Sequence, residues 1–219
     1  MKNVNFFINW GFLLIQFITA VLAIRCWSKS RSINWKIFIV VWILTFLVEA
    51  TGKILGRLGI HNIWLYNIFY IVFYPGIILL YADVFTGKRI QKLVITIIAL
   101  SLTIWAIIHW LSHTNSQLNT YYITVSCSVI ILLALSYLVT LFLDKEITTP
   151  LKNDYYYWFS TGLIIYFVFN AVMLGMYTKI IESKDPWLPQ FTFYAGHLIT
   201  FVLHFFLWIG FNAAFKWMK

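Results

Sequence analysis

The sequence predicts an all-α membrane protein, a bundle of seven transmembrane helices with its N-terminus outside and its C-terminus in the cytoplasm. Three observations predict this class. Of the 219 residues, 62% are hydrophobic and only 11% are charged, whereas soluble domains have about 25% charged residues. Apolar runs long enough to cross a bilayer follow one another along the chain. Lys and Arg residues lie mainly at the ends of these runs, as they do in membrane proteins.

The expected spans leave no room for a separate soluble domain, so residues 1–219 are expected to form a single transmembrane domain. A span needs about 20 mainly apolar residues to cross a hydrocarbon layer of roughly 30 Å. The runs that meet this condition are about 5–27, 33–58, 61–86, 89–112, 119–143, 154–181 and 189–215. The tight connections after the second and third runs predict that these helices are antiparallel neighbours.

The first run is expected to be a permanent helix. A signal peptide places its positive charges before the apolar stretch, but here only Lys2 precedes it, and Arg25 and Lys29 follow it. The two cysteines, Cys26 and Cys127, fall in different runs, so no disulfide framework is expected. Both are interpreted as small packing residues.

Orientation follows from the positive charges in alternate connections, because cytoplasmic loops are enriched in Lys and Arg. One set of connections carries five of these residues and the other carries eleven. The second set is expected in the cytoplasm of a multi-pass protein in the cell's inner (plasma) membrane. The formal charge of +9 therefore reflects topology, with the lipid bilayer as partner and no nucleic acid. Amphipathic rings at the inner interface are expected to be Trp27, Trp35, Trp158 and Trp217.

Polar residues inside the apolar runs form the candidate site. Glu49 is an acidic residue well inside a span, where a charge costs about 2.5–3.5 kcal/mol on insertion scales, so it is expected to face the bundle interior. At a rise of about 1.5 Å per residue, polar groups of four helices lie at one level, about 9–15 Å below the outer helix ends. The expected ligand-binding residues are Glu49, Lys53, Tyr66, Asn67, Tyr70, Asn170 and His197.

A structural interpretation of these residues stays open beside the functional one. Tyr, Asn and His inside bundles often serve as interhelical hydrogen bonds worth about 0.6 kcal/mol each. Lys53 lies one turn outward from Glu49, where an i,i+4 ion pair of purely structural role would also fit.

Metal and cofactor chemistry has weaker support. His109 and His113 have the i,i+4 spacing of two metal ligands on one helix face, but no acidic residue lies near them in the sequence. A bis-histidine haem with His197 or His204 would need a facing ligand from another helix. The first lysine of the last run is Lys216, at its cytoplasmic end, so a retinal Schiff base is excluded. No metal and no cofactor are expected.

Three segments carry a resemblance to known proteins. They are Glu49-Ala-Thr-Gly, Asn62-Ile-Trp-Leu-Tyr-Asn and Tyr157-Trp-Phe-Ser-Thr-Gly-Leu-Ile-Ile-Tyr. Each resembles segments of small bacterial seven-helix integral membrane proteins, a family whose motifs have no assigned chemistry. The resemblance spans most of the chain and implies the same topology, and it implies no activity.

The leading hypothesis is a receptor-like protein that binds a small or lipid-like ligand in an outward-facing polar pocket and signals through a separate partner. Glu49 would be the charged anchor, His197 a hydrogen-bonding or titrating partner, and the tyrosines the wall. Enzymatic activity is left open. A lipid-acting intramembrane enzyme would use Glu49 and His197 as acid and base, within reach of one substrate atom. A small transporter is the third hypothesis. Two observations weaken it: no internal repeat is visible, and most helices lack polar residues in their inner half, with His204 of the last helix as the exception.

Overall fold

Seven long helices make up the part of the chain that the computed structural model describes, which is residues 2–30, 32–85, 89–112, 120–143, 150–176 and 187–217. No strand occurs in these ranges, and all seven helices are long and apolar enough to cross a membrane. The helices are α1 (Lys2–Arg25), α2 (Ile33–Arg57), α3 (Ile63–Val84), α4 (Arg89–Ser112), α5 (Thr120–Leu143), α6 (Tyr155–Gly175) and α8 (Trp187–Trp217), with short 3-10 helices η1 (Trp27–Lys29) and η2 (Leu151–Asn153).

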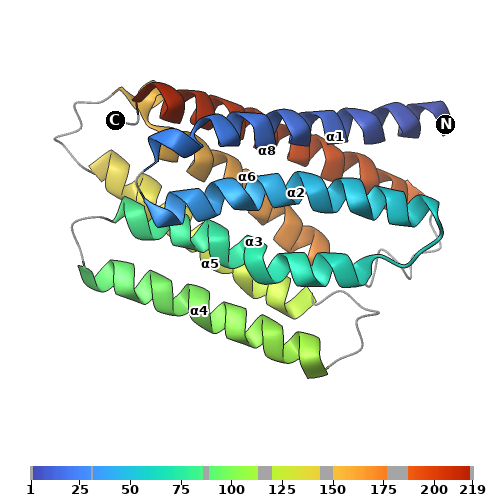
Figure 1. The fold of residues 1–219 in the computed structure, drawn as a ribbon, viewed down its shortest axis with the longest axis horizontal. Coiled ribbons are helices and arrows are strands. Elements are labelled where there is room, and N and C mark those ends of the chain that lie inside the picture. The colour runs from blue at the N-terminus through green and yellow to red at the C-terminus, as the bar shows by residue number, and fades with distance from the viewer. Residues whose placement is uncertain are drawn as a thin grey trace.

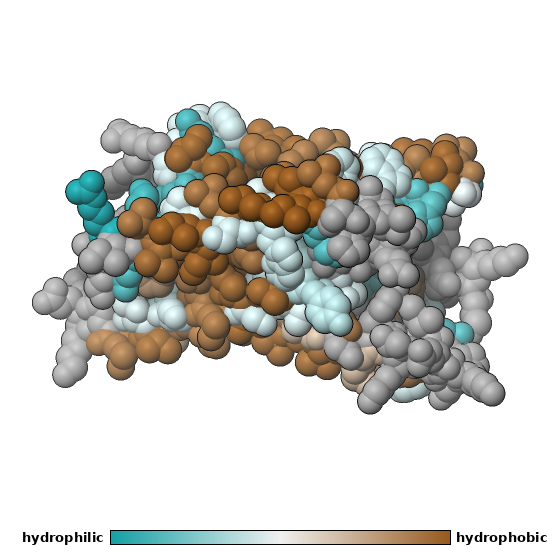
Figure 2. Space-filling view, turned by 90° about the horizontal axis from the view of Figure 1, so that it is seen from below, coloured by the Kyte–Doolittle hydropathy of each residue, from teal (hydrophilic) through white to brown (hydrophobic). Residues whose placement is uncertain are grey.

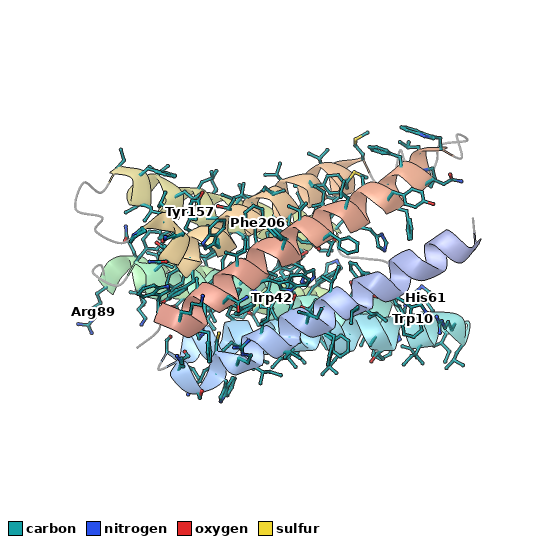
Figure 3. The ribbon with its side chains drawn as sticks, turned by 90° about the horizontal axis from the view of Figure 1, so that it is seen from above. Trp10, Trp42, His61, Arg89, Tyr157 and Phe206 are labelled. Carbon is teal, nitrogen blue, oxygen red and sulfur yellow. The ribbon has the colours of Figure 1, made fainter. Side chains whose placement is uncertain are left out.

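This architecture confirms the helical class and the expected seven helices long and apolar enough to span a membrane. Their insertion in a membrane and the orientation of the termini stay predictions. Each helix overlaps the range expected for it, although residues 177–181 of the expected sixth span lie outside the described residues. The helices run along one common axis, with the two ends of the chain at opposite ends of the bundle (Figure 1). We refer to the end that holds Trp10 and His61 as the outer end and the end that holds Arg89 as the inner end (Figure 3).

Six of the seven helices close a ring around the bundle interior. Contacts run from α1 to α2, α2 to α3, α3 to α5, α5 to α6, α6 to α8, and α8 back to α1. Helix α4 packs outside this ring, mainly against α3, and lies at one edge of the bundle (Figure 1). The contacts of α3 with α2 and α4 confirm the neighbours expected from the tight connections.

The turn between α2 and α3 depends on Gly59. Its φ angle is 70°, in the left-handed region that glycine adopts without the steric penalty of a Cβ atom. The amide of Ile60 donates to the carbonyl of Leu55 over 2.9 Å, and the amide of Gly59 donates to Gly56 over 3.2 Å. These bonds satisfy carbonyls left over at the end of α2 and bring α3 back alongside it.

Asp83 ties three helix ends together at the inner end. Its carboxylate accepts from the Ser32 hydroxyl and, over 2.8 Å, from the Asn34 side-chain amide. Ser32 in turn accepts from the Asn34 backbone amide and so caps the start of α2. The Lys92 ammonium of α4 lies 4.0 Å from the same carboxylate. The sequence did not single out Asp83, because its partners come from other helices.

An aromatic core fills the inner half of the ring. Phe159 of α6 lies 5.2 Å from Phe38 and 5.0 Å from Phe211, measured between ring centroids, and all three are fully buried. Gly210 makes room for this packing, since a Cβ atom there would lie 2.4 Å from the Phe159 ring. Trp35 belongs to this core with 1% exposure. Its ring packs against Tyr155 and Tyr156 of α6, so Trp35 faces the bundle interior, and its level at the membrane interface stays a prediction.

The outer surface of the bundle is largely apolar. In the space-filling view, apolar side chains dominate the middle of the visible face and hydrophilic ones gather mainly toward its ends (Figure 2). Exposed side chains include Leu14, Ile97, Leu132 and Leu198, from four different helices. Such a surface suits contact with lipid. Both cysteines are free and buried, as their interpretation as packing residues requires.

Candidate functional site

A cavity of about 180 Å³ lies inside the ring of six helices. Its wall is mainly aromatic, with rings from α1, α2, α3 and α6: Phe12, Trp42, Tyr66, Phe69, Tyr70, Phe73, Tyr74 and Tyr166. Its polar side chains are Gln16, Thr45, Glu49, Asn170, Thr200 and His204. Helix α5 contributes Ile123, so of the seven described helices only α4 is missing from the wall. The site is therefore built by tertiary packing and by no single segment of the chain.

Glu49 provides a carboxylate to this wall, and a close fit between α2 and α3 positions it. The Tyr66 hydroxyl donates to Glu49 Oε2 over 3.3 Å. Gly52, one turn from Glu49, makes this approach possible, since a Cβ atom there would lie 2.6 Å from the Tyr66 hydroxyl oxygen. The Asn62 side-chain amide donates to the carbonyl of Gly52 over 2.8 Å and holds the two helices in register.

Aromatic rings of α3 line the cavity because they recur every three or four residues on one helix face. Ring centroids are 6.4 Å apart for Tyr66 and Tyr70, and 5.3 Å apart for Tyr70 and Tyr74. Tyr122 of α5 donates to the carbonyl of Tyr70 over 3.1 Å. On the opposite side, Asn170 donates to the carbonyl of Tyr166 over 2.8 Å. Glu49 and these aromatic rings thus line the same cavity.

His204 is held by a hydroxyl on α1. Its Nδ1 lies 2.7 Å from the Thr19 hydroxyl oxygen, which also accepts from Trp208 Nε1 over 2.7 Å and lies 3.0 Å from the carbonyl of Ile15. The hydroxyl has one proton. When the hydroxyl donates this proton to the carbonyl of Ile15, its oxygen must accept from His204. Nδ1 of His204 then carries the ring proton, and Nε2 is an acceptor. Within the described residues, Nε2 makes no hydrogen bond, and His204 lines the cavity.

Two further groups in the wall are buried without a hydrogen-bond partner among the described residues. They are Gln16 Oε1, an acceptor, and Trp42 Nε1, a donor. The residues are 3% and 2% exposed, and both line the cavity; Trp42 lies near the middle of the bundle (Figure 3). An unpaired buried polar group costs about 1–3 kcal/mol. A molecule that bonds to these groups would recover part of that cost.

Four of the seven residues expected to bind a ligand line this cavity: Glu49, Tyr66, Tyr70 and Asn170. Lys53 instead lines a separate apolar groove of about 370 Å³ between α1 and α2, with its ammonium 4.9 Å from the centroid of the Phe12 ring. Asn67 follows Tyr66 on α3 and lies outside the cavity lining. The structure thus does not bring Lys53 and Asn67 into the lining of the cavity that Glu49 lines, and their role in ligand binding stays a prediction.

His197 is also outside the cavity lining, and His204, two turns further along α8, is inside it. His197 donates from Nδ1 to the carbonyl of Phe193 over 2.8 Å, and its ring packs against Phe12 at 5.1 Å. Helix α8 has 31 residues and crosses α1 obliquely (Figure 1). Residue counting from its start overestimates depth, since a tilted helix needs more residues to reach a given level. The stripe His197, Thr200, His204 was the signal that could have identified His204.

In comparisons with known proteins, no family model, no curated protein and no solved structure matches the chain. Among the described residues, no three His, Cys, Asp or Glu side chains lie together as metal ligands do. The fold and the cavity define the class of the chain, a helical multi-pass membrane protein with a partly polar cavity inside its bundle.

Proposed function

We propose that the chain is a receptor-like membrane protein that binds a small organic cation in the cavity and signals through a separate partner. The observation that carries this proposal is the carboxylate of Glu49 in a wall made mainly of aromatic rings. A cation satisfies both features. It pairs with the carboxylate, whose isolation from water is costly, and it is attracted to aromatic faces within about 6 Å.

The other polar groups of the wall support an amine. In the tautomer described above, His204 Nε2 accepts a hydrogen bond, as does Gln16 Oε1. An ammonium N–H is a donor for both. Lys53, one turn outward, is a cation within the chain whose charge acts on Glu49. Its ammonium lies over Phe12 and its side chain lines the other groove, so a ligand cation would share Glu49 with it. This arrangement favours a monovalent cation of modest size over an anion.

Cavity volume limits the ligand to a small molecule. A dry cavity of about 150 Å³ accommodates one benzene ring, so about 180 Å³ suits a single ring bearing an amine or a quaternary ammonium group. A lipid with long acyl chains does not fit inside. Within the hypothesis of a small or lipid-like ligand, the geometry favours the small one.

A receptor is favoured over a transporter by what lies on the inner side of the cavity. Phe38, Phe159 and Phe211 fill the ring there and are fully buried, so transport would require this core to open. A ligand in the cavity would instead touch six helices that pack against one another. Small changes in their packing are a route by which occupancy can reach a partner.

An intramembrane enzyme is the second candidate, because Glu49 and His204 line the same cavity. A carboxylate and an imidazole acting on one substrate are a general acid–base pair. His204 replaces His197 in this role, since His197 lies outside the cavity lining. Turnover by the purified protein of a substrate small enough for the cavity, lost in His204→Gln, would favour this candidate.

The proposal is tested with two probes of the same shape and different charge. Phenyltrimethylammonium is a cation, and tert-butylbenzene is its neutral analogue with carbon in place of nitrogen. We expect the cation to raise the thermal unfolding midpoint of the protein in nanodiscs, and the neutral analogue to raise it far less. Equal shifts would show a cavity that selects shape alone, and no shift with either probe would contradict ligand binding of this class.

A further inference from the structure

A second concave site lies at the inner end of the bundle, between η2 and α8. It has a volume of about 580 Å³, more than the central cavity, and its lining includes Lys152 and Asn153 of η2 together with Lys216 and Trp217 at the end of α8. This groove has no residue in common with the central cavity. Its ligand is therefore a separate question.

The groove has a polar part and an apolar part. Along α8, the residues Phe205, Ile209, Asn212 and Lys216 recur at intervals of four, three and four, which places them on one helix face. Apolar side chains come first and polar ones last, toward the helix end. Phe205 is 57% exposed and Trp217 is 56% exposed, so large rings line an open surface. The expected occupant is amphipathic, with a polar group at the inner end.

The two lysines of the groove make it electropositive. Lys152 and Lys216 are both exposed, and neither forms an ion pair with a carboxylate of the described residues. Lys29 shows the contrast at the same end of the bundle: its ammonium donates to the carbonyl of Phe215 over 2.6 Å and lies over the Phe215 ring. Lys152 and Lys216 lie in separate elements and line one groove, where an anion would contact both.

We infer that this groove binds an anionic phospholipid. The phosphate would lie against Lys152 and Lys216, and an acyl chain would follow Phe205 and Ile209 toward the middle of the membrane. The charge pattern predicts that this end faces the cytoplasm, where the leaflet carries anionic lipids and a basic residue near the surface contributes about 1 kcal/mol of attraction. A free phosphate would engage only the polar part of the groove, and a neutral phospholipid would leave the lysines without a net counter-charge.

Trp208 connects the groove to the bundle interior. It lines the groove, and its Nε1 donates to Thr19, the residue that holds His204 at the central cavity. The indole N–H is thus already bonded, so the lipid headgroup would be recognised by the lysines and Asn153. A lipid in the groove would pack on Trp208 and stabilise its hydrogen bond to Thr19. The inference does not depend on the central cavity having a ligand.

The test is native mass spectrometry of the protein in mixed micelles with phosphatidylglycerol or phosphatidylcholine. We expect one phosphatidylglycerol retained per chain, and at least about tenfold weaker retention in Lys152→Gln/Lys216→Gln, since two basic residues are lost. The matched control is Lys36→Gln/Arg89→Gln, which removes two positive charges at the same end but outside the groove. It should retain the lipid as the natural protein does.

Three results would overturn the inference. One is equal loss of phosphatidylglycerol in the groove variant and the control variant, which would indicate general charge attraction. Another is equal retention of phosphatidylcholine. The third is full competition by glycerol phosphate at the concentration of the lipid, which would show that the groove takes a soluble anion and that the apolar part contributes nothing. The four substituted residues of the two variants are exposed or half-buried, and far-UV circular dichroism checks that each variant is folded.

Discussion

Gly52 of α2 and Tyr66 of α3 fit together so closely that a Cβ atom at position 52 would lie 2.6 Å from the Tyr66 hydroxyl oxygen. That hydroxyl is the hydrogen-bond donor to Glu49 in the cavity. The absence of a side chain at one position thus determines the position of a charged group one turn away. This relationship supports a site whose geometry depends on helix packing as much as on the polar residues themselves.

Gly52→Ala should displace Tyr66 and weaken both the fold and the site. Overpacking of this kind costs about 1–3 kcal/mol, and loss of the bond to Glu49 should reduce affinity for phenyltrimethylammonium. Gly56→Ala is the control on the same helix, because the nearest atom to its added Cβ is 4.0 Å away. Chemical unfolding and ligand binding of the two variants check this, and equal effects at both positions would contradict it.

Gln16→Met should stabilise the ligand-free protein and weaken ligand binding. The Oε1 atom of Gln16 is buried without a partner among the described residues, and removing such a group recovers about 1–3 kcal/mol of desolvation cost. A volume-conserving apolar side chain keeps the packing. A higher unfolding free energy together with a weaker affinity for a cation that has N–H donors, such as benzylammonium, is the expected result. Lower stability would show that the amide has a structural role.

Thr19→Val should destabilise the protein, because it leaves the buried Nδ1 of His204 and Nε1 of Trp208 without their common partner. We expect a loss of about 1–3 kcal/mol. Thr96→Val is the control, since its exposed hydroxyl donates only to the carbonyl of Lys92 in its own helix, and a surface change of this type is worth within about 0.5 kcal/mol. Similar unfolding free energies for the two variants would rule out the shared hydroxyl as an organising contact.

Asp83→Asn should cost far more stability than Lys92→Gln. Asp83 accepts from Ser32 and Asn34 at the start of α2, and bonds to a charged acceptor contribute about 1.5–3 kcal/mol. The Lys92 side chain is 55% exposed and its ammonium lies 4.0 Å from the carboxylate, so this pair should contribute about 0–1 kcal/mol. Unfolding free energies of both variants in the same detergent give the comparison, and a larger effect for Lys92→Gln would contradict the assignment.

The helices and part of the site could be predicted from the sequence, because both have local signals. Long apolar runs predicted the seven helices, and the spacing of Tyr66 and Tyr70 on α3 predicted two of the rings that line the cavity. The cost of an acid inside a span predicted that Glu49 faces the interior. Each of these signals lies within one segment of the chain.

The remaining features depend on contacts between segments. The partner of His204 is 185 residues away in the sequence, and the bonds of Asp83 join the ends of different helices. His197 lies outside the cavity lining, and the tilt of α8, which affects its depth, cannot be obtained from composition. Trp35 shows the same limit, since an interfacial and a core tryptophan look alike until the neighbouring helix is placed.

The most direct test of the account is equilibrium binding of radiolabelled phenyltrimethylammonium to the protein in nanodiscs, for the natural chain and for Glu49→Gln. Glutamine keeps the shape of the side chain and removes its ability to carry a negative charge. The account predicts saturable binding at one site per chain, weakened by at least about tenfold in the variant, because the charge attraction lost at a site shielded from water is worth more than the roughly 1.4 kcal/mol of a tenfold change. Equal affinity in both proteins, or no saturable binding in either, would contradict a cation site at Glu49.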